Sequence, residues 1–167
     1  NVPESECICY ATIHDVIMAV EKGEVDEGVV PFENSIEGTV TSTIDALIFD
    51  VYLNIKAEVI IPIRHSLVVN PSYNGEEITK IMSHPQALGQ CRKFINEHFH
   101  NCIQEPTSST AESARLVMDS PCNVAGIAPV SAAELFGAKI LQKDIQDEAH
   151  NKTRFVVIEP HKEIIPS

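Results

Sequence analysis

Residues 28–40 read GVVPFENSIEGTV, and the interpretation of the rest of the chain depends on this stretch. Its opening apolar run suits a buried strand, and Pro31 is expected to end that strand because proline cannot donate to a strand ladder. The polar residues 33–35 follow at once, and Gly38 supplies the backbone freedom of a tight loop. The pattern predicts a strand that delivers polar groups into a cleft. The same residues are equally typical of an ordinary turn, and this stretch alone does not separate the two interpretations.

The composition is that of a globular protein with an acidic surface. The chain has 167 residues, of which 44% are hydrophobic, and 24 acidic side chains against 12 basic ones give a formal net charge of -12. The basic residues do not cluster, so neither a nucleic acid nor an anionic membrane is an expected partner. An anionic metabolite is still compatible with this charge, because helix N-termini and a few donors set the local potential.

The sequence also argues against secretion and against metal binding. It contains no apolar run of the roughly 20 residues that a membrane span needs, and its first residues do not resemble a signal peptide. A cytoplasmic protein is therefore expected. The five cysteines show no Cys-x-x-Cys spacing, which predicts neither disulfides nor a zinc site. His98, His100 and Cys102 lie close together, but without a matching ligand pair we interpret them as solvated residues.

The spacing of apolar residues alternates between the periods of strands and helices. Strands are expected over Glu6–Tyr10 and Val25–Val30, with a helix between them that Thr12 caps. Such alternation favours parallel strands joined by right-handed crossovers, so the expected fold class is α/β. Pro62 interrupts a later strand, and Pro62–Arg64 is the expected crossing between two lobes.

A second motif follows the strand expected over Ile78–Met82. Ser83 and Gln86 have capping-box spacing at the start of a helix, which accounts for much of this motif. It does not account for His84, or for Gln90 one turn further along.

A third motif, PTSST at Pro106–Thr110, leads into another helix. Ser109 and Glu112 repeat the capping-box spacing. A hydroxyl-rich loop before a helix N-terminus also makes a site for a carboxylate or phosphate, so the capping and ligand roles are compatible.

Four separated stretches together resemble one enzyme family. They are VPFENSIEG at residues 30–38, SHPQALGQC at residues 83–91, SSTAESA at residues 108–114, and NKTRFVVI at residues 151–158. In this order and spacing they are similar to the prephenate dehydratases, and the likeness runs from about Ile13 to Ile158. The Glu-Asn-Ser stretch combined with a Thr-Arg-Phe before the final strand is quite specific to that family.

The resemblance implies a particular α/β architecture. The expected fold is two-lobed and similar to type II periplasmic binding proteins, with mixed, mostly parallel sheets, flanking helices, and the substrate in the cleft. Residues 1–63 and 142–167 would form a discontinuous first lobe, and residues 64–141 an inserted second lobe. The family's first strand with its Gly-Pro-x-Gly-Thr loop, and the ACT domain that binds phenylalanine in many members, are expected to be absent from this sequence.

The resemblance also implies a lyase of phenylalanine biosynthesis that needs no cofactor and no metal. Prephenate loses carbon dioxide and hydroxide from opposite ring positions, which favours a donor to the departing hydroxyl and neutral groups around the carboxylates. By family analogy Thr153 is that donor, whereas His84 is expected to pack or to cap a helix. The expected catalytic residues are Thr153, Asn34, Gln90 and Ser83, and the expected substrate-binding residues are Glu33, Ser35, Ser109, Thr110, Arg154 and Phe155. Of these, Glu33 is more readily interpreted as orienting its loop, and whether Arg154 contacts the substrate or a carboxylate of its lobe stays open.

Two other functions stay open at this point. One is the same reaction on arogenate, which differs from prephenate in its side chain. The other is a two-lobed binding module without turnover, since the fold is shared with solute-binding proteins. A homodimer is the expected assembly.

Overall fold

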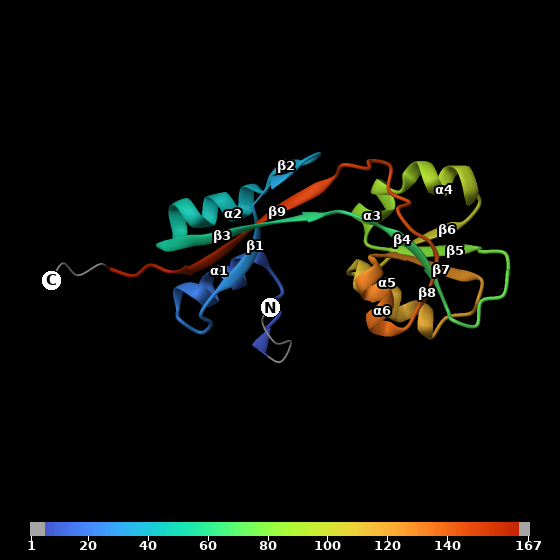
Figure 1. The fold of residues 1–167 in the computed structure, drawn as a ribbon, viewed down its shortest axis with the longest axis horizontal. Coiled ribbons are helices and arrows are strands. Elements are labelled where there is room, and N and C mark those ends of the chain that lie inside the picture. The colour runs from blue at the N-terminus through green and yellow to red at the C-terminus, as the bar shows by residue number, and fades with distance from the viewer. Residues whose placement is uncertain (1–5, 164–167) are drawn as a thin grey trace. The chain divides into compact units, whose positions relative to one another are not determined.

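The computed structural model describes residues 6–163, and the chain divides into two compact units (Figure 1). Unit 1 comprises the residues up to Ile63 together with those from His150 onward, and unit 2 comprises Arg64–Ala149. Residues 142–149 lie with unit 2 and not, as expected, with the first lobe. Ile145 explains this placement, because it is buried in the core of unit 2 and its backbone N–H donates to the carbonyl of His65.

Unit 1 is built on a four-stranded antiparallel sheet. The strands lie in the order β2 (Gly38–Thr39), β1 (Gly28–Asn34), β9 (Lys152–Pro160), β3 (Leu53–Pro62). The helices of this unit are α1 (Ile13–Glu21), α2 (Thr41–Asp45) and the π-helix η2 (Ala46–Asp50).

One face of this sheet is packed and the other is open. Helix α1 begins where expected, because the Thr12 side chain accepts the backbone N–H of Asp15. Its Ile17 and Val20 pack with Val30 of β1 and with two residues of β9 that share one face, Val156 and Ile158. On the opposite face the exposed apolar side chains are Val29, Val59 and Ile61.

Unit 2 has a five-stranded mixed sheet between two pairs of helices (Figure 1). The strand order is β6 (Ile103–Pro106), β5 (Lys80–Ser83), β7 (Val124–Ala128), β4 (Ser66–Val69), β8 (Lys139–Gln142). Strand β5 runs parallel to β6 and β7, whereas β4 runs antiparallel to β7 and β8. The four helices are α3 (Pro85–Gln90), α4 (Arg92–His98), α5 (Thr110–Met118) and α6 (Val130–Phe136).

Each face of the unit 2 sheet has its own buried cluster. Leu88, Cys91 and Ile95 of the α3–α4 segment pack with strand residues such as Ile81 and Ile127. On the other side, helices α5 and α6 contribute a cluster that includes Ala114, Val117, Ala132 and Ala133, which packs with Val68 and Met82. Successive residues of each strand point to opposite faces of the sheet and therefore pack in two separate cores.

The α/β class with two sheets and flanking helices is confirmed, but the expected predominance of parallel strands is wrong. Of the strand pairs formed by residues 6–163, only those made by β5 are parallel. In unit 1, β3 carries the chain toward unit 2 and β9 brings it back, so two such neighbours must run in opposite directions. Residues 7–10 form no strand, and β1 continues past Pro31 to Asn34 through a register shift. Within residues 6–163 no helix is long and apolar enough to cross a membrane.

Candidate active site

Strand pairing in unit 1 brings two expected catalytic residues together. Asn34 at the end of β1 lies opposite Thr153 near the start of β9. The Asn34 Nδ2 group donates to Thr153 Oγ1 at 3.0 Å. Asn34 is 8% exposed and Thr153 is half-buried. The antiparallel register therefore creates a polar pair from residues 119 positions apart in the sequence.

The direction of this hydrogen bond is fixed by the backbone. Asn34 Oδ1 accepts the backbone N–H groups of Ile36 and Glu37, both at 3.0 Å. Since a backbone N–H can only donate, the oxygen of the amide faces the turn and the NH₂ group faces Thr153. Thr153 Oγ1 is thus an acceptor toward Asn34, and its own proton is left for another group. Among residues 6–163 the Thr153 hydroxyl makes no other hydrogen bond.

Ser35 connects the turn after β1 to the start of β9 through hydrogen bonds. Its backbone N–H donates to the carbonyl of Lys152, and its Oγ accepts the Lys152 N–H, both at 3.0 Å. The Ser35 hydroxyl also lies 3.4 Å from Oδ1 of Asn151, which is 4% exposed. Ser35 therefore holds in place the turn on which the orientation of Asn34 depends.

Arg154 and Glu33 form a separate group on the other side of the strand pair. The two residues lie opposite each other in the β1–β9 register and form an ion pair. Glu58 approaches Arg154 at 3.6 Å, and the guanidinium lies 5.4 Å from the centre of the Phe32 ring. Because side chains alternate along a strand, Arg154 points to the opposite face of β9 from Thr153. The structure thus does not bring Glu33 and Arg154 together with the Asn34–Thr153 pair.

A hollow of about 220 Å³ marks the surface around this ion pair. Arg154 Nε is buried there without a hydrogen-bond partner among the described residues. Phe155 lies on the same face of β9 as Thr153, opposite Val59 of β3. The hollow is lined by Glu33, Ser35, Glu58, Ile60, Lys152 and Arg154.

In unit 2 the other expected residues gather at the carboxyl ends of the parallel strands. Ser83 is the last residue of β5 and is fully buried, and its hydroxyl donates to the carbonyl of Ile127 at 2.7 Å. Ser113 Oγ of α5 lies 2.8 Å from the same carbonyl and 2.7 Å from the carbonyl of Thr110, and its single proton can serve only one of them. In open α/β sheets, the carboxyl ends of strands are where ligands bind.

Gln90 is held at the same edge by a residue that sequence reasoning missed. Its Oε1 lies 2.7 Å from Nε2 of His65, and its backbone carbonyl accepts the N–H of Asp147 at 2.7 Å. His65 directly precedes β4 and is 6% exposed. The only signal in the sequence is a single histidine before the apolar run of that strand, which does not indicate a site.

Two helices begin at this edge with side-chain caps. Ser109 accepts the N–H of Glu112 at 3.0 Å, so the predicted cap of α5 is confirmed, and Thr110 is the first residue of that helix. The cap of α3 is His84, whose Nδ1 accepts the N–H of Gln86 at 3.1 Å, so its assignment to Ser83 is wrong by one residue. The observed contact gives His84 the capping role that the sequence favoured.

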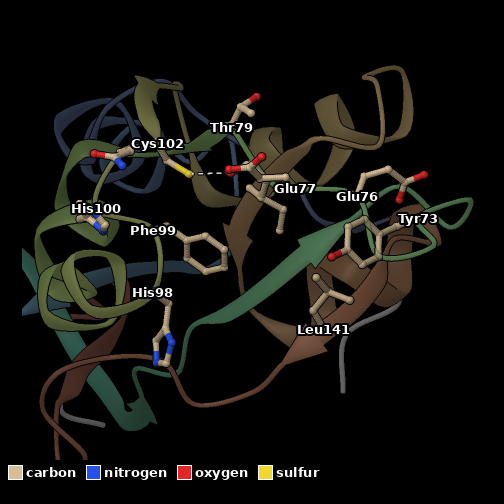
Figure 2. A pocket seen from close by; sticks show the side chains of 11 residues that line it. Tyr73, Glu76, Glu77, Thr79, His98, Phe99, His100, Cys102 and Leu141 are labelled. Atoms are coloured by element: carbon tan, nitrogen blue, oxygen red, sulfur yellow. Dashed lines mark hydrogen bonds between the residues drawn. The ribbon is translucent and has the colours of Figure 1, made fainter.

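A larger hollow of about 350 Å³ lies at the opposite edge of this sheet (Figure 2). It is lined by residues that precede β5 and β6, such as Thr79 and Cys102, together with Phe99. None of the expected site residues lines it. His98 and His100 do line it, but no group of three or more side chains that could hold a metal occurs within the described part of the chain.

All four sequence motifs lie within the part of the chain that a known family model matches. The family model described as prephenate dehydratase matches residues 2–163. The chain belongs to the prephenate dehydratase family. Asn34 and Thr153, which lie opposite each other on β1 and β9, both lie within the matched range.

Several relatives in this family are similar over nearly the whole chain. A prephenate dehydratase of Bacillus subtilis is 42% identical over 96% of this chain and 57% of its own length. Arogenate dehydratase 1 of Petunia hybrida is 36% identical over 98% of this chain and 38% of its own length. A crystal structure of an Arthrobacter aurescens prephenate dehydratase in complex with L-Phe is 35% identical, with a TM-score of 0.80 over 99% of this chain and 56% of that one. The chain thus spans little more than half the length of these prephenate dehydratases.

Proposed function

We propose that the protein is a prephenate dehydratase, a carbon-oxygen lyase that converts prephenate to phenylpyruvate, carbon dioxide and water. Membership of the family supports this proposal. The structural observation that carries it is the polarity of the Asn34–Thr153 pair. The Asn34 amide donates to Thr153, and the threonine hydroxyl keeps its proton for another acceptor.

The reaction depends on a hydrogen-bond donor at the oxygen of the departing hydroxyl group. As the ring carboxylate leaves as carbon dioxide, its bonding electron pair moves into the ring, and the carbon-oxygen bond at the opposite ring carbon breaks. The departing hydroxide is stabilised by a hydrogen bond to its oxygen, and we assign that bond to the Thr153 hydroxyl. An unperturbed threonine is too weak an acid to release its proton by itself, so the departing hydroxide takes up one proton from the solution to become the product water.

The groups of unit 2 suit the carboxylates of the substrate. Helix α5 has nine residues, and the free N–H groups of its first turn attract an anion next to Ser109 and Thr110. Gln90 and Ser83 are neutral polar residues at the same edge of the sheet. We assign these groups to holding the carboxylates. Neutral donors suit the carboxylate that leaves, because a strong cation would stabilise its charge and oppose decarboxylation.

The remaining expected site residues receive two kinds of role. Phe155 shares a face with Thr153, and we assign it to packing against the substrate ring. Glu33 and Arg154 neutralise each other, and Ser35 is bonded to β9. We assign these three to supporting the end of β1, in place of the direct substrate contact expected from the sequence.

Arogenate is the second candidate substrate, and the similarity to the petunia arogenate dehydratase favours keeping it. Its side chain carries an ammonium group where prephenate carries a keto oxygen. The experiment is to incubate the protein with each substrate separately and to measure phenylpyruvate and phenylalanine formation. Turnover of arogenate alone would change the substrate assignment. Binding of both substrates without any product would instead make the protein a binding module.

We further propose that the enzyme acts in the cytoplasm as a homodimer. Unit 1 also exposes the large apolar side chains of Ile48, Phe49 and Tyr52, and these support self-association because exposed apolar surface gains stability when it is covered. The absence of disulfides among the cysteines of residues 6–163 fits a reducing compartment. Sedimentation equilibrium tests the assembly, and a monomer at all concentrations would remove it.

A further inference from the structure

His65 occupies a buried position at the carboxyl edge of the unit 2 sheet. Because β4 runs antiparallel to β7, with Ser66 opposite Ala128, the start of β4 lies where β7 ends. The His65 backbone N–H donates to Gln146 Oε1 at 2.9 Å, and its carbonyl accepts the N–H of Ile145 at 3.0 Å. The residue is 6% exposed. Both its backbone and its ring thus make hydrogen bonds within unit 2.

The surroundings of the ring determine which nitrogen carries the proton. Nε2 lies 2.7 Å from Oε1 of Gln90, whereas Nδ1 is buried and has no hydrogen-bond partner among the described residues. A buried N–H without an acceptor is among the rarest arrangements in folded proteins, and an unused acceptor is tolerated more often. A protonated, charged ring would place the same unpaired N–H at Nδ1. The neutral ring with its proton on Nε2 satisfies all of these conditions.

We propose that His65 is a positioning residue that sets the orientation of the Gln90 carboxamide; this inference rests on the proposed function. An Nε2–H group donates to Oε1 of Gln90, which leaves the amide NH₂ to face the substrate. The reversed amide would place two donors against each other at this short separation. The backbone of Gln90 is also anchored, through Asp147, to the segment that clamps His65. The site therefore presents a donor to a substrate carboxylate.

A double-mutant cycle separates positioning from simple packing. We expect His65→Leu, which fills the space without a donor, to lower kcat/KM for the accepted substrate about 10- to 100-fold, the scale of a small misplacement of a binding group. In the Gln90→Ala background, His65→Leu should lower kcat/KM by less than about twofold, because no amide remains to be oriented. His65→Gln, which can place an amide N–H near the former Nε2, should restore most of the loss. His98→Leu, at the opposite edge of the sheet, is the matched control and should behave as wild type.

A second measurement does not depend on turnover. Long-range ¹H–¹⁵N spectra of the protein labelled in its histidines report which ring nitrogen is protonated, and we expect His65 to carry its proton on Nε2. A proton on Nδ1 would overturn the inference, as would an equal cost of His65→Leu with and without Gln90. If wild-type protein turns over neither prephenate nor arogenate, the proposed function fails, and the spectra alone then decide whether His65 donates to Gln90. If His65→Leu does not fold, the spectra and the His65→Gln variant decide.

Discussion

Replacing Thr153 by valine should abolish most of the activity and leave the fold intact. The change keeps the shape of the side chain and removes the hydroxyl that we assign to the leaving group. We expect kcat to fall about 100-fold or more, which corresponds to about 2.7 kcal/mol of lost transition-state stabilisation. The Asn34 NH₂ group, on a residue that is 8% exposed, also loses its acceptor, at a cost of about 1–3 kcal/mol of folding stability.

These two magnitudes can be measured independently. A domain is typically stable by about 5–15 kcal/mol, so the variant remains folded and unfolding cannot explain the lost rate. Urea denaturation gives the stability, and phenylpyruvate formation under saturating substrate gives kcat. Thr153→Ser, which keeps the hydroxyl, is the control and should lose less than about tenfold. Turnover of Thr153→Val within about threefold of wild type, or an equally inactive Thr153→Ser, would refute the assignment.

Three further predictions concern stability and the neighbouring charges. Gly28→Ala should lower the free energy of unfolding, measured by urea denaturation, by about 1–3 kcal/mol, because the added methyl would lie 2.8 Å from Val20 Cγ2 and 2.9 Å from Val16 Cγ1. The control is Gly89→Ala in helix α3, where the added methyl meets no atom within 4 Å, and this variant should not be destabilised. Burial and, secondarily, the nearby Asp147 carboxylate raise the pKa of the Cys91 thiol from 9.0 to about 12. Between those pH values the Cys91 thiol loses its proton in the unfolded chain and keeps it in the folded chain, so the free energy of unfolding should fall as the pH rises above 9. Cys91→Ala should reduce the slope of the free energy of unfolding against pH by at most about 1.4 kcal/mol per pH unit. Identical slopes for the variant and the wild type would contradict the buried thiol. Glu33→Gln should leave KM within about twofold and lower stability by no more than about 1 kcal/mol, because the ion pair with Arg154 is partly exposed and Glu58 also lies nearby; a tenfold higher KM would return Glu33 to the substrate site.

Local chemistry made some elements of the fold predictable and others not. The start of α1 at Thr12 and of α5 at Ser109 followed from capping residues, whose effect is decided within one turn of helix. The direction of β9 was not predictable in this way, because it depends on where the chain returns after the whole of unit 2. Pro31 shows a similar limit: a missing N–H suggested the end of β1, but a register shift lets the strand continue to Asn34.

In the candidate site, too, some contacts could be predicted from local sequence motifs and others depend on how distant strands pair. Family motifs pointed to Asn34 and Thr153, and strand pairing places them in contact. The same motif grouped Arg154 with Thr153, although the alternation of side chains along β9 separates the two residues. His65 carried no motif, and its contact with Gln90 spans 25 positions that only the folded sheet of unit 2 brings together.

The discontinuity of unit 1 has a consequence for the order of folding. The Ile63 N–H donates to the Asn151 carbonyl at 2.8 Å, so the inserted unit leaves and rejoins unit 1 at neighbouring points. During synthesis the insert is complete before β9 exists, and we expect it to fold first as an autonomous segment. Once the insert has folded, β3 and β9 need to close a shorter effective loop. This lowers the entropic cost of pairing the two strands, although only modestly, because that cost grows slowly with loop length. The hydrogen bond between Asn34 and Thr153 would then be among the last to form, so a nascent chain would acquire the groups that we assign to the carboxylates before the hydrogen-bond donor that we assign to the leaving hydroxide.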